Sequence, residues 1–158
     1  EVGSVRLTPP EGISPVAFIP DFELRTAAAR AALPATVPHG DASFNVARGA
    51  LLAAVLSGNA QASGGADLHS LLMEATRDRL HQEQRRAAME PSLALVDWLR
   101  GAGFAAVVSG AGPTVLSLES VGADIRRDAA AAGWRVVPMG VAPQGVQITR
   151  GSLSKVEF

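Results

Sequence analysis

The sequence predicts an α+β fold in which helices cover an antiparallel sheet. Short apolar runs, typical of buried strands, alternate along the chain with longer segments whose apolar residues have helical spacing. Their order is strand, several helices, strand, turn, strand, helix and strand, which is the split β-α-β-β-α-β pattern with extra helices in the first crossover. With 158 residues, the chain is long enough to be one domain with its own core. We therefore expect a ferredoxin-like sandwich.

The first strand is expected at residues 16–19, where a short apolar run precedes a proline. An Ala-rich helix follows over residues 26–33 and stops at Pro34, because proline cannot donate a backbone hydrogen bond. A longer helix should run from an N-cap at Asp41 to about Ser57. Its apolar stripe consists of Phe44, Ala47, Leu51 and Val55.

After a flexible link at residues 61–65, Asp67 is expected to cap the next helix, whose apolar face is Leu68, Leu71, Leu72 and Ala75. If this helix continued, its polar side would carry a single charged ridge made of Glu74, Asp78, His81 and Arg85. Pro91 suits the first turn of a further helix that ends at the glycines 101 and 103. That helix carries Leu95, Val96, Trp98 and Leu99.

The second and third strands are expected at residues 104–109 and 114–118, on either side of a glycine-rich turn. A last helix should cover residues 121–132, and a fourth strand residues 134–137. Residues 146–149 are either a fifth strand or a continuation of the fourth.

Composition excludes several classes of function. The 14 basic and 15 acidic side chains leave no basic excess for nucleic-acid binding, and an aromatic content of 4% without tyrosine argues against a base-stacking sheet. The absence of cysteine excludes thiol catalysis, Cys-ligated zinc and disulfides, and the three histidines lack metal-ligand spacing. The apolar runs are too short to cross a bilayer. We expect a cytoplasmic protein without a metal site of its own.

The glycine-rich turn lies at Ser109, Gly110, Ala111 and Gly112, followed by Pro113. Its glycines permit backbone angles and close approaches that a side chain would prevent. Such a turn either simply reverses the chain or offers bare N–H groups to an anion.

Thr26 and Arg30 lie four residues apart and therefore share one face of their helix. An arginine offers a planar fork that matches a carboxylate, and Thr26 could add a hydroxyl to the same ligand. Arg85 could bind an anion in the same way. The alternative is that all of them are ordinary surface residues.

Four segments of the chain match known motifs in the same order. They are Phe18–Thr26 with Arg30 and Leu33-Pro34, then Asp41–Asn45 with Arg48, then Asp78–Gln82 with Arg85, and finally Ser109–Thr114. The last segment resembles the third, C-terminal motif of the GHMP kinase superfamily, and the first three resemble segments of the homoserine kinases within it. Together the matches cover residues 16 to about 118.

The resemblance implies the C-terminal domain of a kinase that phosphorylates L-homoserine with ATP in threonine biosynthesis. It places Thr26 and Arg30 at the amino-acid site, Arg85 at the substrate carboxylate, and the loop Ser109, Gly110, Ala111 and Gly112 beside the phosphates. ATP and Mg²⁺ would be bound mainly by an N-terminal domain, because nothing in this sequence resembles the superfamily's nucleotide loop. No catalytic residue is expected in this chain, which alone should be inactive.

The resemblance also implies a division of the chain. Residues 16–158 would form the GHMP kinase C-terminal domain, and residues 1–15, which begin without Met, would connect it to the N-terminal domain. Glu83 stands where the family usually has proline, and Arg86 adds a second basic residue, so either Arg85 or Arg86 could face the substrate.

Two other functions stay open: an amino-acid-sensing regulatory domain of the same fold, and a GHMP kinase acting on mevalonate or a sugar. The sequence does not determine whether the protein forms a homodimer or is inhibited by threonine.

Overall fold

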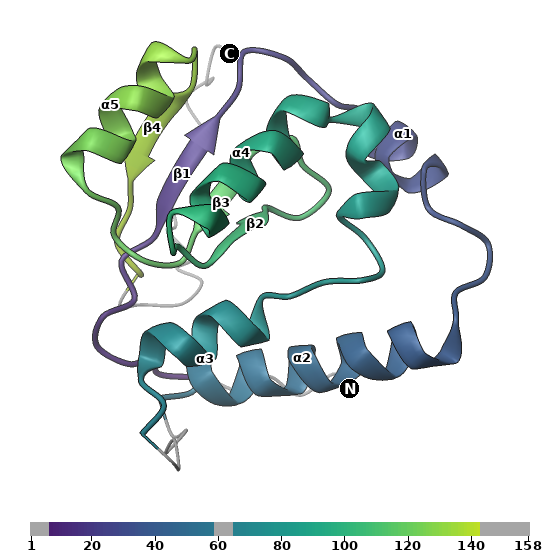
Figure 1. The fold of residues 1–158 in the computed structure, drawn as a ribbon, viewed down its shortest axis with the longest axis horizontal. Helices are drawn as coiled ribbons and strands as arrows, with labels where there is room; N and C mark the ends of the chain where they lie inside the picture. The colour runs from purple at the N-terminus through teal and green to yellow at the C-terminus, as the bar shows by residue number, and fades with distance from the viewer. Residues whose placement is uncertain (1–6, 59–64, 143–158) are drawn as a thin grey trace, which may run out of the picture.

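Four short strands form one antiparallel sheet in the part of the chain that the computed structural model describes, residues 7–58 and 65–142. They are β1 (Val16–Ile19), β2 (Ala106–Val108), β3 (Val115–Ser117) and β4 (Arg135–Pro138). Their order across the sheet is β2-β3-β1-β4, and every neighbouring pair is antiparallel. This order confirms the predicted ferredoxin-like α+β fold (Figure 1). The strand expected at residues 146–149 and most of the link at 61–65 lie outside the described residues.

The helices lie close to their predicted places. They are α1 (Thr26–Ala31), α2 (His39–Leu56), α3 (Leu68–Ala75), α4 (Glu90–Gly101) and α5 (Ala123–Ala131), with a 3-10 helix, η1 (Glu83–Ala88), that was not predicted. As predicted, the Asp67 side chain caps α3 by accepting a hydrogen bond from the Ser70 N–H at 2.8 Å. Pro91 stands in the first turn of α4, also as predicted.

The start of α2 differs from the prediction. Its N-cap is Pro38, not Asp41, because the Pro38 carbonyl already accepts hydrogen bonds from the N–H groups of Asp41 and Ala42, so the helix begins before Asp41. Asp41 lies instead in the first turn, where a carboxylate interacts favourably with the free N–H groups of the helix. Of the predicted apolar stripe, Val55 is buried as expected, but Ala47 is exposed.

The charged ridge predicted for α3 does not form, because the helix ends at Ala75. After it, the carboxylate of Asp78 accepts hydrogen bonds from the backbone N–H groups of Leu80, His81 and Gln82. A side chain that satisfies successive backbone donors in this way stabilises a turn in place of a helix. The chain therefore leaves the line of α3 before it reaches the glycine-rich turn.

The sheet has two apolar faces. One face carries Phe18 and Val115 and packs on α4 and α5 through the largest core cluster, which consists of Val16, Phe18, Leu95, Val96, Leu99, Ala106, Val115, Val121 and Ala129. The other face carries one apolar residue from each strand in register, the row Val107, Leu116, Ala17 and Val137. This second face is the one that helps to form the hollow described below.

Two smaller clusters hold the remaining helices at opposite ends of β2 and β3. At one end, α2 and α3 run side by side and pack on Ala105 and Leu118 (Figure 1). At the other end, Ala29 of α1 packs with Met89 and with Ala111 of the glycine loop. The chain thus brings α1, η1 and the glycine loop together. None of the helices in the described residues is long and apolar enough to span a membrane.

Candidate functional site

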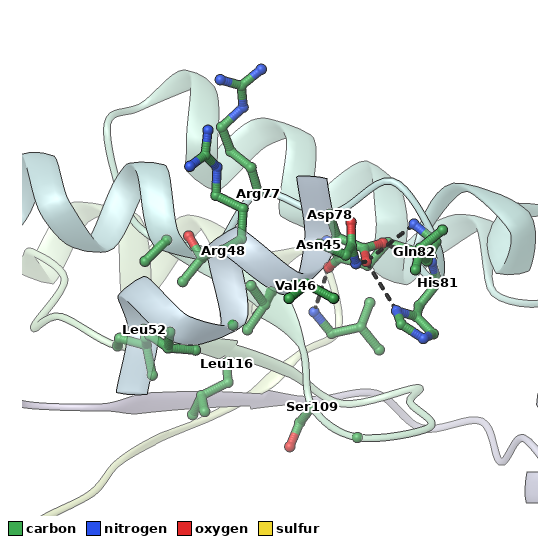
Figure 2. A pocket seen from close by; sticks show the side chains of 18 of the residues that line it. Asn45, Val46, Arg48, Leu52, Arg77, Asp78, His81, Gln82, Ser109 and Leu116 are labelled. Carbon is green, nitrogen blue, oxygen red and sulfur yellow. Dashed lines mark hydrogen bonds and ion pairs between the residues drawn. The ribbon is translucent and has the colours of Figure 1, made fainter. Parts of the chain in front are cut away.

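A hollow of about 830 Å³ lies between α2, the segment that follows α3, and the second face of the sheet. Its volume is within the range of small-molecule sites, roughly 300–1,000 Å³. One part is apolar and is lined by Val46, Leu52, Val107 and Leu116. The other part is polar and is lined by Asn45, Asp78, His81, Gln82, Arg85, Ser109 and Gly110. Figure 2 shows the cluster around Asp78 on one side and Ser109 below it.

Asp78 is the centre of the hydrogen bonds at the polar end. Besides three backbone N–H groups, its carboxylate accepts hydrogen bonds from Asn45 Nδ2 at 2.6 Å and from His81 Nδ1 at 3.0 Å. Burial alone would raise the pKa of Asp78, but the hydrogen bonds from Gln82, Asn45 and His81 outweigh it and lower the pKa from 3.8 to about 2. Asp78 is therefore ionised at neutral pH.

Asn45 joins α2 to this turn in both directions. Its Nδ2 donates to Asp78, and its Oδ1 accepts from the Arg79 N–H at 2.9 Å. Because an ionised carboxylate can only accept hydrogen bonds, the Nδ1 of His81 carries a proton. The turn is thus held by side chains from α2 as well as by its own.

Arg85 connects the predicted substrate segment to the glycine loop. Its Nε donates to the carbonyl of Ala29 in α1 at 3.2 Å, and its Nη1 donates to the carbonyl of Gly110 at 3.4 Å. Within the described residues, no carboxylate pairs with this guanidinium. Its positive charge is therefore not neutralised by the protein, which is the property that an anion-binding arginine needs.

Arg86, the neighbouring arginine, is placed differently. Its guanidinium pairs with Glu83, Glu90 and Asp97, and it does not line the hollow. Hydrogen bonding to Glu83 raises the pKa of Arg86. Of the two arginines that the sequence left undecided, Arg85 is the one that borders the hollow.

Two further arginines, Arg48 and Arg77, border the hollow, and both have an acidic partner. Arg48 and Arg77 both pair with Glu74. In Figure 2 their guanidinium groups extend away from Ser109 and Leu116. Because these two arginines share one carboxylate, they are only partly neutralised; Arg85 differs in having no carboxylate partner among the described residues.

The glycine loop follows directly from β2. Gly110 and Gly112 have positive φ angles of 60° and 86°, which side chains rarely adopt. A Cβ on Gly112 would also lie 2.8 Å from the end of the Met89 side chain, which would have to move to admit it, so the main requirement for glycine here is the positive φ. Ser92 Oγ donates to the Pro113 carbonyl at 2.6 Å. Ser109 and Gly110 line the hollow, while Ala111 and Gly112 lie against the core.

Thr26 and Arg30 are exposed on α1 and do not line this hollow. Ala29, between them in sequence, is fully buried and gives its carbonyl to Arg85. The structure therefore brings Arg85, Ser109 and Gly110 to one hollow and places Thr26 and Arg30 on the adjacent helix. Whether those two contact a ligand stays a prediction.

Sequence reasoning missed the roles of Asn45, Asp78 and Gln82. The available signal was their presence in the matched segments, because spacing alone assigned Asp78 to a helical ridge. Phe44 was predicted only as part of the apolar stripe of its helix, and its contacts with arginines were not foreseen. The guanidinium carbons of Arg48, Arg77 and Arg79 lie 4.5, 5.3 and 4.0 Å from its ring centre.

The comparisons with known proteins agree with this fold. The model of the family described as "GHMP kinases C terminal" matches residues 51–133. The chain therefore belongs to the GHMP kinases, as their C-terminal domain.

Within that family the chain is similar to homoserine kinases. It is 42% identical to the homoserine kinase of Streptomyces coelicolor over 146 residues, which are 92% of this chain and 44% of the relative. It is 46% identical to that of Rhodococcus opacus over 129 residues, which are 80% of this chain and 38% of the relative. The chain thus spans less than half the length of these curated relatives.

A crystal structure of homoserine kinase from Cytophaga hutchinsonii has the same fold, with a TM-score of 0.66 and 21% identity. It matches 87% of this chain and 44% of that one.

Proposed function

We propose that this chain is the C-terminal part of a homoserine kinase, which transfers the γ-phosphoryl group of ATP to the hydroxyl oxygen of L-homoserine. The new P–O bond forms as the bond to ADP breaks, and the hydroxyl proton is released. The observation that carries the proposal is the 42% identity to a curated homoserine kinase across 92% of the chain. The product, O-phospho-L-homoserine, belongs to threonine biosynthesis, which we place in the cytoplasm.

In this proposal Arg85 binds the carboxylate of homoserine. The support is its position at the polar end of the hollow and the lack of a described carboxylate partner for its charge. The two carbonyls that it contacts orient the guanidinium and leave other N–H groups for a ligand. Thr26 and Arg30, one turn apart on α1, would complete the amino-acid site.

The glycine loop would lie beside the phosphates. Phosphoryl transfer depends mainly on positioning and on stabilising charge. The N–H groups of Ser109 and Gly112 already donate to backbone carbonyls of the turn, so the N–H groups that the loop would offer to a phosphate are those of Gly110 and Ala111. Gly110 lies in open space with a positive φ, and no side chain there would prevent a phosphate from approaching the backbone.

ATP and Mg²⁺ would be bound mainly by an N-terminal part joined through residues 1–15. Among the described residues, no group of three or more His, Asp or Glu is placed to hold a metal ion. The acidic residue of the hollow, Asp78, already accepts five hydrogen bonds, so this donor set does not fit Mg²⁺. We derive no step of the reaction from a metal bound by this chain.

The test is an ADP-release assay on the full-length protein with L-homoserine, mevalonate and galactose as competing acceptors. We expect turnover with homoserine and none above background with the other two. Turnover with mevalonate or galactose alone would assign the protein to a different GHMP kinase. No turnover with any acceptor, together with tight binding of threonine, would instead favour the sensing domain.

The 158-residue chain assayed alone should give no turnover, because the proposal places the nucleotide in the other part of the protein. Activity of the isolated chain at the rate of the full-length protein would contradict that division.

A further inference from the structure

One side chain links the Asp78 turn to the glycine loop. Gln82 donates its backbone N–H to Asp78 Oδ2 at 2.7 Å, and its side-chain Oε1 accepts a hydrogen bond from the Val108 N–H at 2.8 Å. Val108 is the last residue of β2, immediately before Ser109 and Gly110. The hydrogen bond therefore reaches the point where the loop leaves the sheet.

The partner of Gln82 is a backbone group that the sheet cannot satisfy. β2 is an edge strand, next to β3 only. Its flanking residues bond to β3, since the Ser109 N–H donates to the Thr114 carbonyl and the Leu118 N–H donates to the Ala105 carbonyl. In an antiparallel pair, every second residue of a strand directs its backbone N–H and carbonyl toward the neighbouring strand, and the residues between direct theirs away. Val108 lies next to Ser109 in the chain, so its N–H points away from β3.

Side chains cover this edge at two places with different consequences. Arg100 donates to the Ala106 carbonyl at 3.2 Å and to Met73 and Thr76, so it ties β2 to the end of α3. Gln82 covers the edge next to the loop and lines the hollow. Without the Gln82 acceptor the Val108 N–H would lose its hydrogen-bond partner, and we expect the end of β2 and the loop after it to be held less firmly.

The position of Gln82 is itself held. Asp78 accepts its backbone N–H, and Asn45 from α2 donates to the same carboxylate. The series Asn45, Asp78, Gln82, Val108 thus runs from α2 to the loop through hydrogen bonds of 2.6, 2.7 and 2.8 Å.

We propose that Gln82 is a positioning residue for phosphoryl transfer, which sets the glycine loop against the phosphates of ATP through the Val108 N–H. The inference rests on the proposed function and adds a residue that acts through another, without touching the substrate. Replacing the Gln82 side chain leaves its backbone bond to Asp78 intact. Arg85 keeps its bond to the Ala29 carbonyl, and only its longer contact with the Gly110 carbonyl moves with the loop. The effect should therefore fall mainly on ATP and on the chemical step, and less on homoserine.

The test compares Gln82→Leu and Gln82→Asn with the wild type in the full-length protein. Leucine has no acceptor, and asparagine is one methylene too short to reach Val108. In both variants we expect kcat/KM for ATP to fall about tenfold, because small misplacements of a positioning group have effects of this size or larger. The homoserine KM should change less, by about twofold, because Arg85 keeps its bond to the Ala29 carbonyl and loses at most the longer contact with Gly110.

Gln84→Leu is the matched control. Gln84 also makes one side-chain hydrogen bond to the backbone, to the Arg79 carbonyl at 2.9 Å, but it does not line the hollow. This variant should keep the wild-type kinetics for both substrates.

Hydrogen exchange provides a measurement that does not depend on activity. The Val108 amide should exchange faster in both Gln82 variants and at the wild-type rate in Gln84→Leu. Unchanged exchange at Val108, or faster exchange with unchanged ATP kinetics, would overturn the inference.

If the wild-type protein does not phosphorylate homoserine at all, the proposed function fails, and with it the role of Gln82 in phosphoryl transfer. Faster exchange would then show only the structural link. If Gln82→Leu does not fold, Gln82→Asn supplies the same comparison.

Discussion

The predicted substrate residues fall into two regions that the protein treats differently. On η1, Arg85 is held by two backbone carbonyls from distant parts of the chain. On α1, Thr26 and Arg30 are exposed and make no side-chain hydrogen bond or ion pair with the described residues. The first region is organised in advance of any ligand. The second has conformational freedom that a ligand would have to remove. Arg85 and Arg30 have similar expected roles, but the fold holds only the Arg85 side chain in a fixed position before a ligand binds.

The largest effect is expected for Arg85→Ala. If Arg85 binds the substrate carboxylate as proposed, this substitution removes that charged contact, and it also removes the hydrogen bonds that join α1 to the glycine loop. We expect a loss of about 3 kcal/mol of transition-state stabilisation, or about a hundredfold in kcat/KM for homoserine. Steady-state kinetics of the full-length protein measure it. Arg85→Lys should restore little of the lost kcat/KM, because a lysine cannot contact two carbonyls and a carboxylate in one plane. Wild-type kinetics for Arg85→Ala would remove Arg85 from the site.

Asp78→Asn tests how the organised region is held. The pKa of Asp78 is lowered from 3.8 to about 2, so the ionised carboxylate stabilises the folded state above pH 3.8, and this stabilisation is lost as the pH falls through about 2. We expect the variant to lower the free energy of unfolding by about 2 kcal/mol at pH 7. Denaturant unfolding at several pH values measures it, and the difference between variant and wild type should shrink below pH 4 and approach zero near pH 2. A difference independent of pH would mean that the charge of Asp78 is not the cause.

Arg30→Ala tests the exposed region. If Arg30 binds the homoserine carboxylate, the homoserine KM should rise about tenfold, less than for Arg85→Ala, because the contact is solvated and is not organised in advance. The ATP KM should not change. An unchanged homoserine KM would mean that Arg30 does not bind the substrate. Arg85 would then be the predicted carboxylate ligand, and α1 would be a surface helix without a role in binding.

The smallest effect is expected for Arg86→Ala. Arg86 pairs with three carboxylates at the surface, and such pairs contribute little, so the free energy of unfolding should fall by less than about 1 kcal/mol. The homoserine KM should stay at the wild-type value. A rise comparable to that of Arg85→Ala would show that the wrong one of the two neighbouring arginines has been assigned to the substrate.

Much of the fold could be predicted from the sequence, because strands and helices depend on local spacing. The run at residues 16–19, the cap at Asp67 and Pro91 in the first turn of α4 all hold. The predictions were wrong where another interaction outweighed the local sequence pattern. Pro38 displaced Asp41 as the N-cap of α2, and the Asp78 carboxylate ended the expected continuation of α3.

The candidate site was predictable only in part. The glycine loop could be found from its residues, and the comparison with homoserine kinases was available from motifs alone. The hydrogen bond between Asp78 and Asn45 could not be found, because Asp78 lies in the turn after α3 and Asn45 lies 33 residues away on α2. Spacing along one helix carries no information about such a pair.

The order of strands and helices, the resemblance to the family and the position of the glycine-rich turn all follow from the sequence alone, because they depend on local patterns of residues. The tertiary structure decided that Arg85 and not Arg86 borders the hollow, and that Gln82 contacts the edge of β2. The reason is that these choices depend on backbone groups far along the chain. The two carbonyls that hold Arg85 lie 56 and 25 residues from it, and only the folded sheet and its helices bring them together.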